Sequence, residues 1–128
     1  MKKIFILFSF LIITITASAE TLYYRAVMYQ YRHVKPGSEW IWDDPVTINQ
    51  PVVINTNNNT ITINNTQNYT IYGASSTKHD GPSEIFTANG IHSTGTKVTI
   101  IFTKVAGKTY MRINYPRKQY LYRLIKVE

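Results

Sequence analysis

The chain contains no cysteine, which excludes a disulfide-stabilised scaffold, a cysteine-ligated zinc site, a thiol nucleophile and an acylated lipoprotein anchor. Charged residues make up 16% of the 128 residues and hydrophobic residues 44%, and this composition excludes a disordered tail or a coiled coil. The sequence also lacks a phosphate-binding glycine loop and a dinucleotide-binding fingerprint. We therefore expect no cofactor.

Residues 1–19 have the order of an export signal. Two lysines precede an almost wholly apolar run over 4–15, and the Ala-Ser-Ala of 17–19 supplies the small residues that a signal peptidase requires. We expect cleavage before Glu20 and a mature single domain over 20–128 that is periplasmic or extracellular. The apolar run is too short to span a membrane comfortably and no later run is longer, so no membrane span is expected after signal removal.

The rest of the chain has the two-residue periodicity of β-strands. β-Branched and aromatic residues dominate it, and strong helix formers are scarce. Strands are predicted over 23–33, 46–48, 52–54, 60–63, 69–72, 84–87, 98–103, 109–115 and 120–127. Strands about every 8–12 residues with tight turns indicate an all-β fold, an antiparallel meander that closes into a small barrel or folds into a β-sandwich.

Two segments are predicted to be loops. The segment 73–83 is rich in glycine and serine, and 89–96 begins with an Asn-Gly pair that accepts positive φ. The Asn-x-Thr pattern of a glycosylation acceptor occurs at Asn58, Asn64 and Asn68. We interpret them as structural, because asparagine tolerates left-handed turn geometry.

Basic residues concentrate in the last part of the chain. Signal removal would leave 12 basic and 7 acidic residues, a net charge of +5, and the stretch from Lys97 to Lys126 contains no acid. Such a patch attracts phosphates, and tyrosines stack on bases, so nucleic-acid binding is one interpretation. The alternative is that these residues occupy turns and polar strand faces, where lysine also discourages edge pairing. Because an exported protein seldom meets nucleic acid, we do not expect it as a partner.

Ten tyrosines are many for this length. In the last predicted strand Tyr120, Tyr122 and Leu124 share one face, and the opposite face is also largely apolar. One face fills the core, and the other would line a ligand groove, meet a partner or expose amphipathic rings. Strict alternation in the first strand gives two faces, Tyr23, Val27, Tyr29 and Tyr31 on one and Tyr24, Ala26 and Met28 on the other.

The densest unusual cluster is 39–44, Glu-Trp-Ile-Trp-Asp-Asp. In an extended stretch Trp40 and Trp42 point the same way and, with Asp43 as hydrogen-bond acceptor, would form a platform for a sugar ring. The alternative is that both indoles plug one end of a small barrel, since large aromatic side chains more often serve packing. The candidate ligand-binding residues are Trp40, Trp42, Asp43, Tyr120 and Tyr122.

Patterns for catalysis or metal binding are weak. The histidines, His33, His79 and His92, have no compact metal-ligand spacing, so no metal site is expected. A Ser-His-Asp combination within 75–80 lies in a predicted loop without a nucleophile elbow. The acids of 39–44, with Glu84, contain the residue types of a glycosidase pair. No catalytic residue is assigned.

The order of these elements resembles a known group of proteins. The first strand contains Tyr-Arg-Ala-Val-Met-Tyr (24–29), followed by Trp-x-Trp (40–42), a hairpin over 53–63, Tyr-Thr-Ile-Tyr (69–72) and a tyrosine-rich closing meander. Over most of its mature length the chain is similar to small exported proteins of gut bacteria with a calycin-like (lipocalin-like) β-barrel. The resemblance implies that fold and an exported location, and it carries no catalytic residues across. The Gly-x-Trp of true lipocalins is missing from the first strand.

These observations together predict a non-catalytic exported binding protein whose ligand is a small hydrophobic molecule, a glycan or a protein. The alternative is a small hydrolase of glycans or envelope material that uses the acids near Trp40 and Trp42. A cavity with converging carboxylates would favour the enzyme, and a filled interior with an exposed tyrosine face would favour protein interaction.

Overall fold

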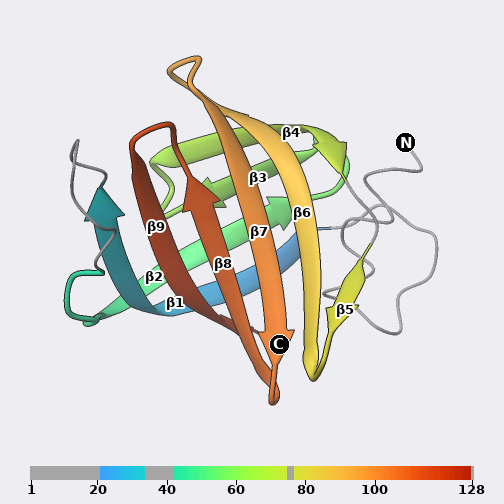
Figure 1. Cartoon of the computed structure of the whole chain (residues 1–128). Helices are drawn as coiled ribbons and strands as arrows, with labels where there is room; N and C mark the ends of the chain where they lie inside the picture. Colours follow the sequence, from blue (N-terminus) through green and yellow to red (C-terminus); the bar gives the residue numbers. More distant parts are fainter. Residues whose placement is uncertain (1–20, 34–41, 75–76, 128) are drawn as a thin grey trace.

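The computed structural model describes residues 21–33, 42–74 and 77–127, which form nine β-strands (Figure 1). The strands are β1 (Thr21–His33), β2 (Val46–Asn55), β3 (Thr60–Ile63), β4 (Gln67–Ala74), β5 (Lys78–Asp80), β6 (Ser83–His92), β7 (Lys97–Val105), β8 (Lys108–Asn114) and β9 (Lys118–Lys126). In these ranges we find no helix with the length and apolar character needed to cross a lipid bilayer. The predicted signal over 1–19 lies outside them, as do Glu39, Trp40, Ser75 and Ser76.

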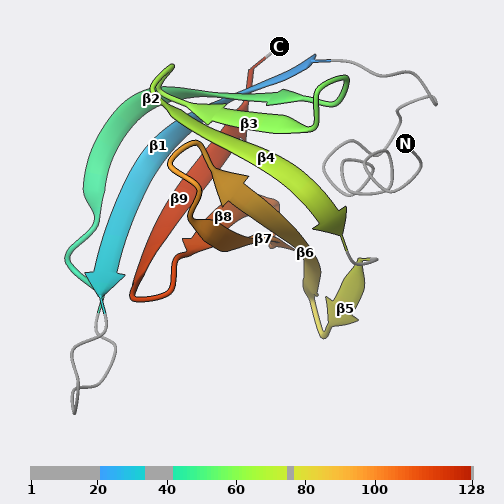
Figure 2. The ribbon, with the colours of Figure 1, turned by 90° about the horizontal axis from the view of Figure 1, so that it is seen from above.

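Eight of the strands close into an antiparallel barrel. Neighbouring strands follow the order β4-β3-β2-β1-β9-β8-β7-β6, and β6 returns to pair with β4. The short β5 pairs with the first part of β6 beside this ring. Figures 1 and 2 show the wall of β6–β9 crossing in front of the wall of β1–β4. The prediction of an antiparallel all-β fold is confirmed, and the barrel rather than the sandwich is formed.

Alternate side chains of each strand fill the barrel. In β7 Val98, Ile100 and Phe102 are buried, whereas the residues between them are more exposed. Phe86 of β6 faces Phe102 in register, and both are fully buried. Met111 of β8 completes this packed layer, because it is the register partner of Phe102 on the other side. The hydrophobic core therefore comes from neighbouring hairpins, as the two-residue period predicts.

A β-bulge in β1 changes which tyrosines face inward. Ala26 and Met28 pair with consecutive residues of β9, so Val27 has no partner on that strand. An extra residue shifts the alternation by one position, and Tyr29 and Tyr31 therefore face the interior on the same side as Ala26. The strict alternation predicted for this strand places these tyrosines opposite Ala26, and beyond the bulge it is wrong.

The segment 89–96, predicted as a loop, is half strand. β6 continues to His92, and Gly90 lies within the barrel wall. A Cβ atom at Gly90 would lie 3.2 Å from the carbonyl oxygen of Thr70 in β4. Gly90 thus permits the close approach of β4 and β6 that closes the barrel, rather than forming a turn.

Two other boundaries differ from the prediction. β2 is one strand where the sequence predicts two, over 46–48 and 52–54. Pro51 does not interrupt it, and its carbonyl oxygen accepts a hydrogen bond of 2.8 Å from the backbone N–H of Asn64. β5 occupies the middle of the predicted loop over 73–83, because its three residues pair with the start of β6.

The asparagine-rich turns have the expected left-handed geometry. Asn59 after β2 has a φ of 58°, and Asn64 and Asn65 between β3 and β4 have φ values of 53° and 57°. Asparagine adopts this region more readily than most residues. Of the three asparagines interpreted as structural, Asn64 is confirmed as a left-handed turn residue, whereas Asn58 does not have a positive φ and Asn68 lies within β4.

Candidate ligand-binding cavity

The barrel interior is hollow at one end. A cavity of about 1240 Å³ lies at the end of β1, beside the β3–β4, β6–β7 and β8–β9 turns. These turns lie toward the upper left of Figure 1. Its floor includes the buried side chains of Ile63, Tyr69 and Tyr122. Beyond this floor the interior is filled by residues such as Phe102, so the cavity opens at a single end of the barrel.

Tyrosine is the commonest residue in the cavity wall. Six of the ten tyrosines line it, namely Tyr29, Tyr31, Tyr69, Tyr115, Tyr120 and Tyr122. The ring of Tyr120 is central to this set, because its centroid lies 5.8 Å from that of Tyr29, 5.2 Å from Tyr31 and 5.5 Å from Tyr115. These separations are those of favourable stacked and edge-to-face aromatic pairs. The wall is therefore a connected set of rings that support one another.

The pairing of β1 with β9 builds one side of this wall. Three inward-facing pairs follow one another from floor to rim: Tyr29 with Tyr122, Tyr31 with Tyr120, and His33 with Lys118. Opposite residues of antiparallel strands have their Cβ atoms about 5 Å apart, so each pair forms one layer of the wall. The bulge at Val27 is what brings the β1 residues of these pairs to the inner face.

A hydrogen-bonded group forms the other side of the cavity. The hydroxyl oxygens of Tyr69 and Tyr115 lie 2.5 Å apart, and the ring of His92 lies 5.1 Å from that of Tyr69. The backbone N–H of Thr94 donates to His92 Nδ1 at 3.2 Å. The ring proton therefore lies on Nε2, which donates to Gln67 Oε1 at 2.7 Å. Both ring nitrogens are occupied, and this fixes the imidazole as part of the wall.

The deep tyrosines are held as neutral phenols. Burial is the main cause that raises the pKa of Tyr69 and of Tyr122, and the hydrogen bond to Tyr115 raises that of Tyr69 further. Burial also raises the pKa of Tyr29, followed by the effects of neighbouring tyrosines and then of Asp43. A neutral phenol can both donate and accept a hydrogen bond, so the wall offers stacking surface and polar contacts together.

The cavity rim is cationic. Lys118 Nζ lies 4.7 Å from the centroid of the Tyr115 ring and 5.4 Å from that of Tyr120. A hydrogen bond to Tyr120 is the main cause that raises the pKa of Lys118, so its ammonium group is charged at neutral pH. The exposed Arg117 lies next to it on the rim. Among the described residues, no aspartate or glutamate lines the cavity.

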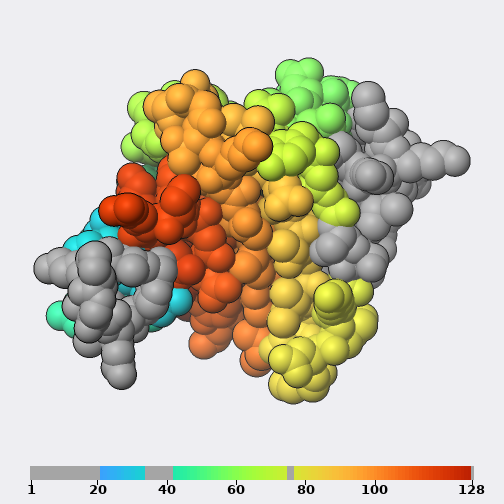
Figure 3. Space-filling view, turned by 45° about the horizontal axis from the view of Figure 1, so that its top comes forward, coloured from blue at the N-terminus to red at the C-terminus, as the bar shows by residue number. Residues whose placement is uncertain are grey.

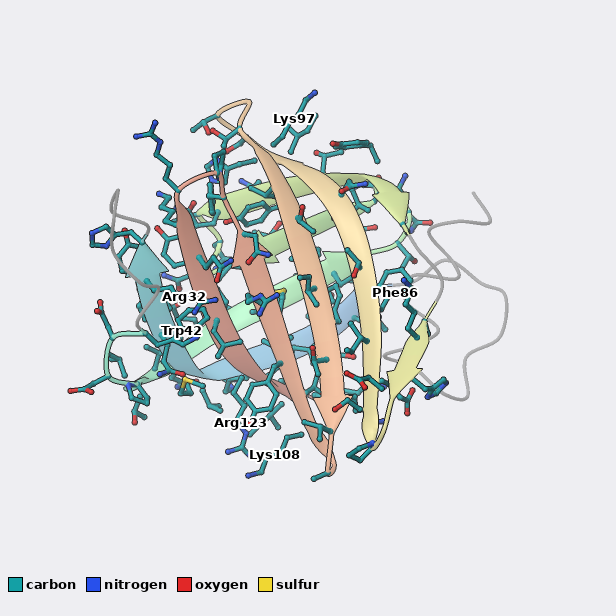
Figure 4. All side chains as sticks on the ribbon, viewed as in Figure 1. Arg32, Trp42, Phe86, Lys97, Lys108 and Arg123 are labelled. Atoms are coloured by element: carbon teal, nitrogen blue, oxygen red, sulfur yellow. The ribbon has the colours of Figure 1, made fainter. Side chains whose placement is uncertain are left out.

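The sequence-predicted candidates divide between two places. Tyr120 and Tyr122 lie in the cavity wall. Trp42 does not: its ring centroid lies 4.2 Å from the guanidinium carbon of Arg32 (Figure 4), which points away from the barrel interior. Asp43 is exposed, and its backbone N–H donates to the carbonyl oxygen of Tyr31 at 2.9 Å. The interpretation of Trp42 as a barrel plug is therefore wrong, and Trp40 lies outside the described residues.

Carboxylates do not converge in the described part of the molecule. Asp43 and Asp44 are exposed near β2, whereas Glu84 pairs with Lys104 in register near the opposite end of the barrel. Across 21–33, 42–74 and 77–127, no three His, Asp or Glu side chains group so that they could hold a metal ion.

Sequence reasoning did not identify Tyr29, Tyr31, Tyr69 and Tyr115 as cavity residues. The available signal is the high tyrosine content, because tyrosine is less often fully buried than aliphatic residues and phenylalanine. No protein-family model matches the chain, and neither does any curated protein or solved structure. The geometry of the cavity is therefore the basis for a functional assignment.

Proposed function

We propose that this protein is a non-catalytic binding protein that holds a small organic ligand in the cavity at the open end of the barrel. The observation that carries the proposal is the size and position of that cavity, about 1240 Å³ above a packed floor. Ligand sites are commonly concave, largely apolar and furnished with a few polar groups, and small barrels hold their ligands in the mouth. The six tyrosines supply both the apolar surface and the polar groups.

The proposal includes export and a calycin-like architecture. An eight-stranded antiparallel barrel with a cavity at one end supports the resemblance to calycin-like exported proteins. The leader over 1–19 supports export, and a bacterial expression host provides the test. Intact mass of the exported protein should correspond to a chain that begins at Glu20, and a full-length cytoplasmic product would contradict this part of the proposal.

A cavity-filling variant tests the binding function directly. Phenylnaphthylamine is an uncharged aromatic probe that fluoresces in apolar surroundings, and the proposal predicts saturable binding at one site per chain. Ile48→Trp would fill the cavity from β2, and Ile125→Trp adds the same ring on the exposed outer surface of β9. The Ile48→Trp variant should lose at least about tenfold in affinity and the Ile125→Trp variant less than about twofold.

Circular dichroism and thermal unfolding confirm that both variants are folded before their affinities are compared. Equal loss of binding in the two variants, or no saturable binding to the unmodified protein, would overturn the proposed function. A probe that binds all three proteins equally occupies another surface, and that result also contradicts it.

A further inference from the structure

The lining of the cavity carries information about the shape of its ligand. Only three aliphatic side chains of the β-strands line it, Val46, Ile48 and Ile63, whereas tyrosine and histidine rings account for eight of the twenty lining residues. Flat rings offer stacking and edge-to-face contacts to another flat ring, and these are worth about 0.5–1.5 kcal/mol per pair beyond burial. A flexible alkyl chain gains no such additional free energy from aromatic contacts. The wall therefore favours a planar aromatic ligand over a long aliphatic one.

The charges on the rim carry information about the polarity of the ligand. Lys118 lies where the ring wall ends, within 5.4 Å of the centroids of two tyrosine rings. His33 is its register partner on β1, and Arg117 precedes it in the β8–β9 turn. Because no described carboxylate lines the cavity, Lys118 and Arg117 have no acidic partner within it. An anionic group at the mouth would complete the site.

Resting on the function proposed above, we propose that the cavity takes a planar aromatic anion, with its ring system between the tyrosines and its carboxylate or sulfonate group at Lys118 and Arg117. A neutral sugar fits this site less well, because it carries no anionic group for Lys118 and Arg117. The tyrosine wall would contact the ring system of the ligand, and the cationic rim would contact its anionic group. Each part can therefore be tested separately.

Two probes with the same ring systems separate the charge from the rings. Anilinonaphthalene sulfonate carries a sulfonate that phenylnaphthylamine lacks. The native protein should bind the sulfonate at least about tenfold more tightly at low salt, and this preference should fall as ionic strength rises from about 20 mM to about 300 mM. Naphthoate should displace the bound sulfonate at a concentration about tenfold below that of decanoate, an aliphatic acid of similar carbon number.

A matched pair of lysine variants locates the anionic group. Lys118→Gln should lower the affinity for the sulfonate probe by about tenfold and that for the neutral probe by less than about twofold. Lys108→Gln makes the same change at the start of β8, at the other end of the barrel (Figure 4), and should change neither affinity. Arg117→Gln, in an exposed position, gives a second variant that does not disturb the wall.

The outcomes distinguish the two proposals. Equal binding of both probes, with no effect of Lys118→Gln or Arg117→Gln, would overturn the anionic ligand while the cavity-filling result still supports the binding function. Decanoate that displaces the probe as well as naphthoate does would overturn the aromatic part. If Lys108→Gln weakens binding of the sulfonate probe as much as Lys118→Gln does, the effect comes from the net charge of the protein. That result would overturn the proposal that the anionic group binds at the rim.

Discussion

The hydroxyl groups of Tyr69 and Tyr115 form a hydrogen bond of 2.5 Å between two parts of the barrel that are not paired in the sheet. Tyr69 belongs to β4, and Tyr115 lies in the turn after β8, 46 positions later. Tyr69 is buried, whereas Tyr115 is partly exposed. The bond therefore joins the floor of the cavity to its rim.

Removing the two hydroxyls of this pair should have non-additive effects on stability. Tyr115→Phe leaves the buried hydroxyl of Tyr69 without its partner and should lower the free energy of unfolding by about 1–2 kcal/mol. The double variant with Tyr69→Phe should lose less than the sum of the two single variants, which urea unfolding measures. Tyr72→Phe on the exposed face of β4 should stay within about 0.5 kcal/mol of the native protein. Strictly additive losses would contradict this prediction.

Stability should fall in the alkaline range because several tyrosines are buried. Burial raises the pKa of Tyr24 from 10.0 to about 12, and the pKa values of Tyr69 and Tyr122 are raised as well. Above pH 10 the unfolded chain loses these protons while the folded chain keeps them, so unfolding releases protons and is favoured by rising pH. Each such group contributes a slope of up to about 1.4 kcal/mol per pH unit between pH 10 and its folded pKa.

The variant Tyr24→Phe isolates one of these groups. Urea unfolding between about pH 10 and about pH 11.5 should give a slope shallower by about 1 kcal/mol per pH unit than in the native protein. The ionisation of lysines is common to both proteins and cancels in this comparison. The Tyr24 hydroxyl is also buried without a hydrogen-bond partner among the described residues, so the variant should be at least as stable at pH 7. An unchanged alkaline slope would show that Tyr24 ionises freely in the folded state.

Trp42 should contribute modestly to stability. Its ring stacks with Arg32 outside the barrel, and exposed cation–π pairs are worth about 0.5–1 kcal/mol, compared with about 3–5 kcal/mol for a buried tryptophan. Trp42→Ala should therefore lower the free energy of unfolding by about 1 kcal/mol and leave the affinity for phenylnaphthylamine unchanged. A loss of several kcal/mol, measured by urea unfolding, would restore the interpretation of Trp42 as a packing residue of the core.

Two glycines give a matched test of how β4 and β6 close the barrel. Gly90→Ala should lower stability by about 1–3 kcal/mol, because its methyl group would meet Thr70 O at 3.2 Å and Ile71 Cδ1 at 3.3 Å. Gly73→Ala, in the partner strand, would meet nothing closer than 3.6 Å and should change stability by less than about 0.5 kcal/mol. Thermal unfolding of both variants compares the two, and equal effects would contradict the role given to Gly90.

The hairpins of the last third were predictable, because β7, β8 and β9 alternate strictly and are joined by short turns. Their inward residues, such as Ile100 and Tyr122, lie on the faces that period two gives them. The sequence did not decide between a sheet that closes into a barrel and one that folds into a β-sandwich. The pairing of β4 with β6 depends on strand tilt and on the missing side chain of Gly90, and an Asn-Gly pair more often forms a turn.

The cavity was only partly predictable, for two physical reasons. The bulge at Val27 has no residue signature, yet it moves Tyr29 and Tyr31 to the inner face. Moreover, the alternation of a strand predicts which side chains face inward but not whether side chains from opposite walls meet. A hollow end and a filled end of the barrel therefore have the same sequence pattern. The indole of Trp42 was assigned to the site because aromatic residues beside acids suit sugars, but Arg32 covers it.

The packed lower half of the barrel, whose outer wall includes β6–β9 (Figure 3), contains the fully buried core, while the residues of the proposed ligand site lie on the upper layers and turns. Tolerance to change should differ between these two halves. Substitutions among rim positions such as Thr66, Thr94 and Thr96 leave the interior layer of Phe86 and Phe102 untouched. Substitutions at the rim should therefore change the ligand preference of the proposed site while the packing of the lower half stays the same.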